Sequence, residues 1–195
     1  LELVTSMGFR GEALASIASV SRFRLQTARA EDEAGSELSL DGQEKAPQIV
    51  SVRHPVGTSV VVRDLFFNIP VRREFLKSDK MELKQINDVI RRFALIYPKV
   101  ALTYIQDGKK RWDIPSATDD MAFRERLKKF MPEHFSELAL SHQVRDGEIS
   151  LRGYLAPPEL SRSQADYQFL FVNNRPIKDN KLAYAIKRAY QELIF

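Results

Sequence analysis

Three Asp-Gly dipeptides divide this sequence into pairs of strand-like segments, and they constrain its fold more than any other feature. They lie at Asp41-Gly42, Asp107-Gly108 and Asp146-Gly147. Asp-Gly is a favoured connection between antiparallel strands because both residues tolerate the left-handed backbone that a two-residue turn requires. Segments with the helical spacing of apolar residues lie between these pairs. The sequence therefore predicts an α+β chain built from antiparallel hairpins and helices.

The first part of the sequence predicts a meandering antiparallel sheet and three helices. Strand-like alternation or high β-propensity is found in residues 23–27, 36–40, 48–52 and 59–63. A short buried helix is expected after Gly11, and a second from Pro70 to Leu76, because proline is favoured in the first helical turn. A longer helix should follow Ser78 or Asp79 as N-cap. Its apolar stripe, at spacings of three and four residues, consists of Leu83, Ile86, Ile90, Phe93 and Tyr97.

The second part predicts two further hairpins, two helices and a domain boundary. Hairpins are expected over residues 100–114 and 137–156, helices over 123–130 and 179–193, a mobile loop over 157–166 and a buried strand over 167–172. The stretch Pro115–Asp120 combines a proline with small polar residues and is the best linker candidate. We therefore expect one domain over residues 1–117 and a second, incomplete domain over residues 118–195.

Composition excludes several classes of protein. The absence of cysteine excludes disulfides and thiolate zinc sites, and the three histidines lack the spacing of a metal motif, so no metal ligand is assigned. No apolar run approaches the roughly 20 residues of a membrane helix. Lys and Arg exceed Asp and Glu by 30 to 26, which permits nucleic-acid binding without demanding it. Because Leu1 is not an initiator methionine, the chain is expected to begin inside a longer protein.

Residues 8–14 (GFRGEAL) place two glycines just before a predicted helix. Glycine lets a backbone approach a ligand closely, and free amides at a helix N-terminus attract anions. Arg10 adds a positive charge that suits a polyphosphate. A plain turn, with Glu12 complementing the helix dipole, explains the same residues. Taken alone, the segment leaves phosphate binding open.

Residues 57–76 (GTSVVVRDLFFNIPVRREFL) supply a second motif. Together with residues 8–17 (GFRGEALASI), this stretch closely resembles the signature segments of the MutL family of DNA mismatch repair proteins, within the GHKL superfamily of ATPases. Residues 172–177 (VNNRPI) are similar to a strand and turn in the second domain of that family. The pairing and spacing of the motifs are far more specific than either motif alone. The resemblance spans nearly the whole chain.

The resemblance implies a fold. Residues 1–117 would form the C-terminal part of a GHKL-type α/β sandwich ATPase domain, including the end of its lid, its phosphate loop and its adenine-side strand. Residues 118–195 would begin a ribosomal-protein-type βαβ domain of the transducer kind, which contacts DNA.

The resemblance also implies an ATP site. Thr58 would lie beneath the adenine, its hydroxyl sharing a water or hydrogen bond with an aspartate that precedes Leu1 in the family. The residues expected against the phosphates, mainly through backbone groups, are Gly8, Arg10, Gly11, Glu12, Ala13 and Leu14.

The residues that the family uses for hydrolysis have no match in this sequence. The Mg²⁺-binding asparagine, the glutamate that activates water and a lysine on the γ-phosphate would lie outside residues 1–195. Hydrolysis requires a positioned base and metal-neutralised phosphates, so no catalytic residue is assigned. We expect the parent protein to be a slow Mg²⁺-dependent ATPase, and this segment alone to be inactive.

The family binds DNA with little sequence preference, which implies contacts to phosphates. On the last predicted helix, Lys181 and Arg188 are seven residues apart and share one face, and the apolar face would hold Leu182, Ile186, Ala189 and Leu193. An ordinary solvated helix surface explains the same charges. The candidate DNA contacts are Arg162, Arg175, Lys178, Lys181, Lys187 and Arg188.

The function implied by the resemblance is that of a molecular switch. ATP would order a lid, N-terminal regions would pair as a homodimer or heterodimer, and the resulting clamp would engage DNA, a mismatch-recognition protein of the MutS type and a repair nuclease or helicase. The protein would be cytoplasmic and nucleoid-associated in a bacterium, or nuclear in a eukaryote. The alternatives are a topoisomerase or chaperone ATPase of the same superfamily and a non-catalytic interaction module.

Overall fold

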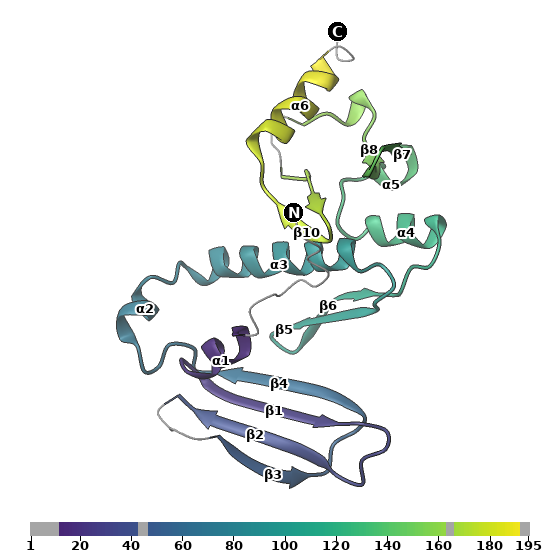
Figure 1. Ribbon diagram of the computed structural model, residues 1–195. Helices are drawn as coiled ribbons and strands as arrows, with labels where there is room; N and C mark the ends of the chain where they lie inside the picture. The colour runs from purple at the N-terminus through teal and green to yellow at the C-terminus, as the bar shows by residue number, and fades with distance from the viewer. Residues whose placement is uncertain (1–11, 43–46, 163–165, 192–195) are drawn as a thin grey trace. The chain divides into compact units, whose positions relative to one another are not determined.

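An antiparallel sheet of four strands dominates the first of the two units into which the chain divides (Figure 1). The computed structural model describes residues 12–42, 47–162 and 166–191. The first unit covers Leu1–Lys84 and the second covers Gln85–Phe195. The elements of the first unit are α1 (Ala13–Ala18), β1 (Arg22–Ala28), β2 (Gly35–Asp41), β3 (Gln48–Val52), β4 (Gly57–Arg63), α2 (Pro70–Glu74) and the start of α3 (Asp79–Ile96).

The strand order in the sheet is β3-β2-β1-β4, with every pair antiparallel. All four strands lie where the sequence predicts them, but the predicted meander is wrong for β4. This strand pairs with β1, at the far edge from β3, so that Val60 lies opposite Leu25. The alternation of apolar residues determines which side chains of β4 share a face. It does not determine whether β4 pairs with β3 or with β1.

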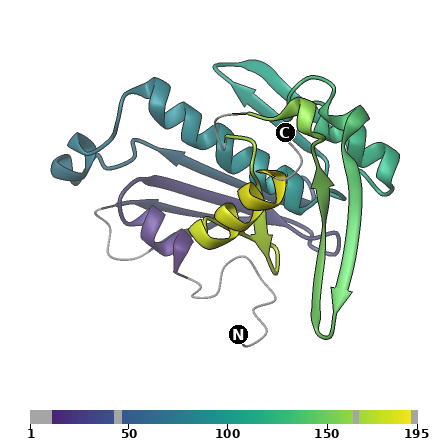
Figure 2. The same cartoon turned by 90° about the horizontal axis from the view of Figure 1, so that it is seen from above.

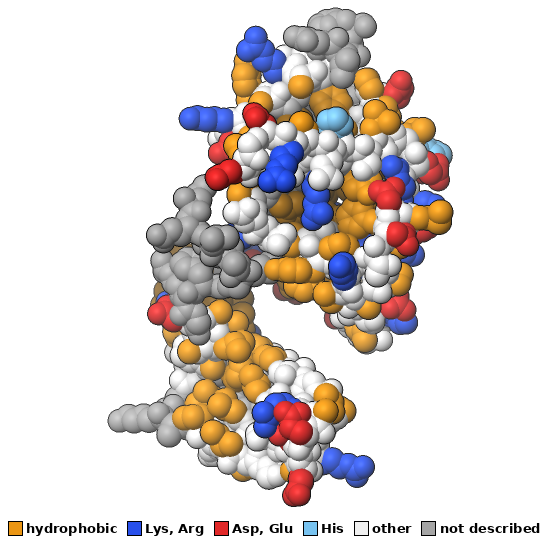
Figure 3. All heavy atoms as spheres, turned by 45° about the vertical axis from the view of Figure 1, so that its right-hand side comes forward, with side chains coloured by type: hydrophobic (Ala, Val, Ile, Leu, Met, Phe, Trp, Pro, Cys, Tyr) orange, Lys and Arg blue, Asp and Glu red, His pale blue; other side chains and the backbone are white. Residues whose placement is uncertain are grey.

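The strand register separates the two faces of the sheet sharply. Arg22 is bound to Asp41 at 3.7 Å and to Asp64 at 3.3 Å, which marks the polar face. The opposite face is apolar and, at Val60 and Val62, exposed at 47% and 42%; Figure 3 shows hydrophobic side chains gathered on the lower part of the molecule. The members of this apolar face are Phe23, Leu25, Leu38, Leu40, Ile49, Val60 and Val62.

In its described residues, the second unit contains the end of α3, three two-stranded hairpins and three further α-helices. Figure 2 shows the β7–β8 hairpin as a long ribbon. The elements are β5 (Leu102–Gln106), β6 (Lys109–Ile114), α4 (Asp120–Leu127), α5 (Phe135–Leu138), β7 (Leu140–Asp146), β8 (Ile149–Leu155), the 3₁₀ turn η1 (Pro158–Leu160), β9 (Leu170–Val172), β10 (Arg175–Ile177) and α6 (Asn180–Gln191).

The β5–β6 turn has the Asp-Gly geometry that the sequence predicts, whereas in the β7–β8 turn Gly147 has a φ of 56° and Asp146 is still paired, with Ile149. Asp107 and Gly108 both have positive φ, at 51° and 71°, and Asn173 and Asn174 repeat the pattern at 48° and 61°. Two successive left-handed residues form the tight turn that suits the twist of antiparallel strands. The Asn-Asn pair therefore closes the β9–β10 hairpin by the same chemistry as Asp-Gly.

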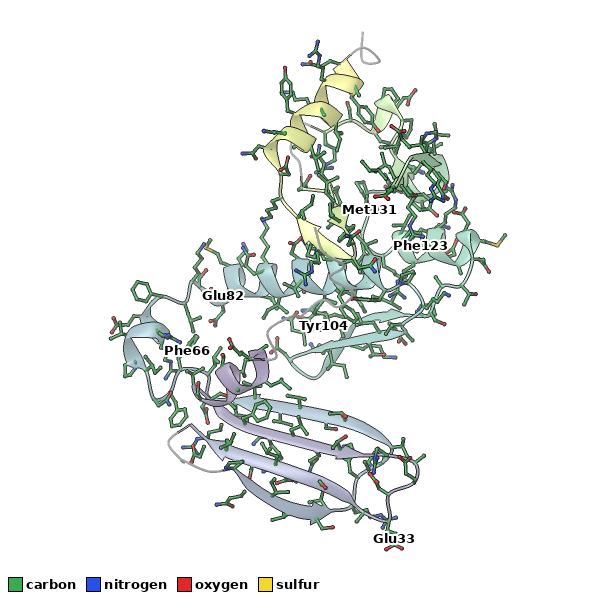
Figure 4. All side chains as sticks on the ribbon, viewed as in Figure 1. Glu33, Phe66, Glu82, Tyr104, Phe123 and Met131 are labelled. Atoms are coloured by element: carbon green, nitrogen blue, oxygen red, sulfur yellow. The ribbon has the colours of Figure 1, made fainter. Side chains whose placement is uncertain are left out.

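Two apolar clusters form the core of the second unit. One joins Ala94 of α3, Ile114 of β6 and Phe130, with Trp112 packed against it. The other is built on Leu127, Phe135 and Ala139. The partly buried residues around the second cluster are Leu95, Phe123, Met131, Tyr154, Ala156 and Leu160; Figure 4 labels Phe123 and Met131.

Four local predictions are wrong. The buried strand predicted over residues 167–172 is limited to β9, and its last residue, Val172, is 42% exposed. α1 is not a buried helix, because Leu14 is 48% exposed and only Ala18 is buried. The predicted strand from residue 137 begins at Leu140, since the short helix α5 occupies the preceding residues. On α6 the half-buried residues are Ala183, Ile186 and Tyr190, whereas Leu182 and Ala189 of the expected apolar face are exposed. Leu193 lies outside the described residues. Across the described ranges, no helix combines the length and hydropathy needed to cross a membrane.

Candidate functional site

The predicted phosphate-binding segment is only partly described. Gly8, Arg10 and Gly11 lie outside the described residues, whereas Glu12 immediately precedes α1. The carbonyl of Glu12 accepts a hydrogen bond from the Ser16 amide at 2.9 Å, and its side chain makes no cap contact. The last two residues of the expected set, Ala13 and Leu14, form the exposed first turn of α1.

Thr58 is the second residue of β4 and faces Thr27 of β1 directly. The two hydroxyl oxygens lie 2.9 Å apart, and the Thr27 hydroxyl lies 3.2 Å from the carbonyl oxygen of Gly57. Thr27 can therefore donate to Gly57, which leaves the Thr58 hydroxyl to donate to Thr27 and to accept from another group. Thr58 is exposed and shares the apolar face of the sheet with Val60. Sequence reasoning did not identify Thr27, because its role depends on the strand register.

Gly57 opens this strand with a φ of 129°, a backbone conformation that favours glycine. A Cβ at this position would have open space around it, so the requirement for glycine comes from the backbone angle and not from crowding. The glycine therefore sets the entry angle of β4 and the position of the Thr58 hydroxyl.

The second signature segment forms a tight turn after β4 that is bonded to the end of α1. The Phe66 amide donates to the Val20 carbonyl at 2.6 Å. The Asn68 side-chain amide donates to the carbonyls of Ser19 and Gly42, at 2.9 and 3.1 Å. Asp64 and Phe66 both have positive φ, 51° and 63°, and Figure 4 labels Phe66 in this turn. The segment thus joins α1, β2 and β4.

Phe67 of this turn serves packing, whereas Phe75, further along the same segment, is 80% exposed. Phe67 is half-buried, and the Arg22 guanidinium lies 5.3 Å from the centre of its ring. Gly42, at a φ of 53°, fits closely beneath it, because a Cβ there would lie 3.0 Å from a ring carbon of Phe67. Through these contacts with Arg22 and Gly42, the Phe67 ring stabilises the turn.

The predicted DNA contacts divide into two groups. Arg162 is bound to Asp166 at 3.2 Å and lies over the ring of Tyr167, and Arg175 is half-buried in β10. The four exposed lysine and arginine residues lie on α6 or just before it: Lys178, Lys181, Lys187 and Arg188. Within the described ranges, no carboxylate lies within ion-pair distance of these four cations. DNA contact by these four residues stays a prediction.

A polar cluster that sequence reasoning missed fastens α4 to β8. The Tyr154 hydroxyl donates to one Asp120 oxygen, and the Arg124 guanidinium donates to the other at 2.8 Å. The hydrogen bonds from Tyr154 and Arg124 lower the pKa of Asp120. Burial, followed by the Asp120 carboxylate, raises the pKa of Tyr154. Arg124 also donates to the carbonyls of Ser136 and Ala139, so this cluster stabilises the fold.

Comparison with known proteins places these features in a family. A family model for the DNA mismatch repair protein, C-terminal domain, matches residues 127–195. The whole chain is 43% identical to the DNA mismatch repair protein MutL of Pseudomonas entomophila (strain L48) and 42% identical to that of Pseudomonas fluorescens (strain SBW25). In both cases the match covers 31% of the relative, so the chain spans about a third of the length of these proteins.

The fold is also similar to a solved structure. The Aquifex aeolicus MutL ATPase domain complexed with ADP matches with a TM-score of 0.71 and 27% sequence identity, over 94% of this chain and 72% of that one. This confirms the expected mixed α/β fold of the GHKL type. With its two signature segments, its match to MutL relatives over all 195 residues and its similarity over 94% of the chain to a MutL ATPase domain, the chain belongs to the MutL family of DNA mismatch repair proteins.

Proposed function

We propose that this chain contributes one side of the nucleotide site in the N-terminal region of an ATP-dependent mismatch repair protein. The observation that carries the proposal is its similarity, over 94% of the chain, to a MutL ATPase domain complexed with ADP. In the parent protein, ATP binding and slow Mg²⁺-dependent hydrolysis would drive dimerisation of a clamp on DNA. A mismatch-recognition protein of the MutS type and a repair nuclease or helicase would be its partners, in the bacterial cytoplasm or a eukaryotic nucleus.

Thr58 fits the adenine side of such a site. Its hydroxyl lies on an apolar sheet face and retains acceptor capacity after bonding Thr27. An adenine ring requires an apolar surface for its face and hydrogen-bonding groups at its edge. The phosphates would be held by residues 8–14, with Mg²⁺ neutralising their charge, and no residue of this chain is proposed as a metal ligand.

We expect Thr58→Val in the full-length protein to weaken ADP and ATP binding about tenfold, the equivalent of losing one hydrogen bond of about 1.4 kcal/mol. Valine has the shape of threonine without the hydroxyl. Isothermal titration with ADP measures the change. Thr58→Ser, which keeps the hydroxyl, should stay close to wild type, and so should Thr103→Val, which removes an exposed strand hydroxyl bonded to Asp113. Wild-type affinity in the Thr58→Val protein would refute the assignment.

We further propose that the exposed cations on α6 contact DNA phosphates. Reversing Lys181 and Arg188 together to glutamate should lower DNA affinity. The slope of log affinity against log salt should fall by about 1.8, because each phosphate contact contributes about 0.9. Fluorescence anisotropy over a salt series measures both quantities.

The control for this experiment changes the net charge equally at a different place. Lys109 and Arg111 are exposed on β6, and their reversal to glutamate alters the overall charge by the same amount. If the α6 variant and the β6 variant show the same salt slope, α6 is not the contact surface.

A further inference from the structure

Arg126 of α4 is a buried cation that has no acidic partner among the residues that the structure describes. Its exposed fraction is 1%, and it is the largest fully buried side chain in the described residues. Its guanidinium donates to four backbone carbonyls that lie far from it in the sequence: Ala94 at 2.8 Å, Pro115 at 2.6 Å, Val100 at 3.0 Å and Tyr97 at 3.3 Å.

The carbonyl of Ala94 explains why a cation is buried here. The amide four residues further along would normally bond this carbonyl within the helix, but that position is Pro98, which has no N–H. The end of α3 therefore presents unsatisfied carbonyl oxygens at the negative pole of the helix dipole. The fork of N–H groups on arginine can satisfy several of these oxygens together, whereas lysine presents one compact ammonium.

The segment that joins β6 to α4 is held by the same set of contacts. The Pro115 carbonyl accepts from Arg126, and the Ala117 amide donates to the Pro98 carbonyl at 2.8 Å. Ala117 is 4% exposed. Residues 115–120, which their composition predicts to be a linker, are thus hydrogen-bonded at two points, through Arg126 and through the Pro98 carbonyl, to the end of α3.

We propose that Arg126 locks α4 to the C-terminal end of α3, so that residues 115–119 are a rigid joint and not a hinge. The predicted domain boundary at residues 117 and 118 falls inside this joint. Movement of the segment from β7 to α6 relative to α3 would then arise C-terminal to α4. The inference concerns the mechanics of the chain and does not depend on nucleotide or DNA binding.

The first test is hydrogen exchange of the full-length wild-type protein. A rigid joint requires the Ala117 amide to exchange as slowly as the central amides of α3, because both then open only with the whole unit. Exchange of Ala117 at the rate of an exposed loop would overturn the proposal, whatever the behaviour of any variant.

The second test compares variants at Arg126. We expect Arg126→Met to speed exchange at Ala117 at least tenfold while the centre of α3 stays protected, and Arg126→Lys to have a smaller effect. Lys128→Met removes an exposed cation from the adjoining turn and should leave Ala117 unchanged. A folded Arg126→Met protein with wild-type protection at Ala117 would contradict the lock.

Discussion

Replacing Phe130 by alanine is expected to lower the free energy of unfolding by about 3–5 kcal/mol, the range for a large aromatic removed from a core. Phe130 is 3% exposed and packs with Ala94 and Ile114. It also meets Trp112 edge to face, with ring centres 5.4 Å apart and planes at 88°. Such a pair contributes about 0.5–1.5 kcal/mol beyond the buried area. Phe130 lies just after α4, so its ring packs this part of the chain against α3 and β6.

Chemical denaturation followed by Trp112 fluorescence measures this loss, since the only tryptophan of the chain lies against the substituted ring. Tyr184→Ala removes an aromatic ring that is 64% exposed on α6, and should alter stability by less than about 0.5 kcal/mol. If Phe130→Ala changed stability as little as this control, the cluster around Ala94 would not be the core of the second unit.

Turns and helix caps were predictable from the sequence because local chemistry determines them. Asp107-Gly108 closes a hairpin through its own backbone preference, and Asp119 caps α4 by accepting the Ala122 amide at 2.8 Å. The position of β4 beside β1 was not predictable, since strand order depends on contacts between distant segments. The motifs similarly indicated a site at Thr58, but its partner Thr27 follows only from the register.

Arg126 shows the same limit for charged residues. In the sequence it is one of several cations between Arg124 and Lys129, which reads as solvated helix surface. Its burial follows from the unsatisfied carbonyl of Ala94, and that carbonyl is unsatisfied because Pro98 lies four residues later. The proline is visible in the sequence, but which side chain would fill the gap depends on how α4 packs on α3.

Val60→Asp should have opposite consequences in this segment alone and in the full-length protein. A sandwich requires a second layer over one face of the sheet, and the apolar face is the one suited to it. In the segment, Val60 is 47% exposed, so a carboxylate there should be tolerated and should improve solubility. Under a second layer the same carboxylate would be an unpaired buried charge, with an expected loss of about 3–5 kcal/mol in stability and the loss of nucleotide binding.

Val61→Asp is the matched control, because Val61 lies on the opposite face and directly across from Arg24. A carboxylate there gains a cross-strand cation and should change stability by no more than about 1 kcal/mol in either form of the protein. Unfolding midpoints and ADP titrations on all four proteins give the comparison. If the sandwich forms, Val60→Asp should be tolerated in the segment, where the second layer is absent, but not in the full-length protein. Val61→Asp should be tolerated in both proteins. Equal tolerance at position 60 in the full-length protein would mean that the apolar face is uncovered there, and Thr58, on that same face, could not then line an enclosed nucleotide site.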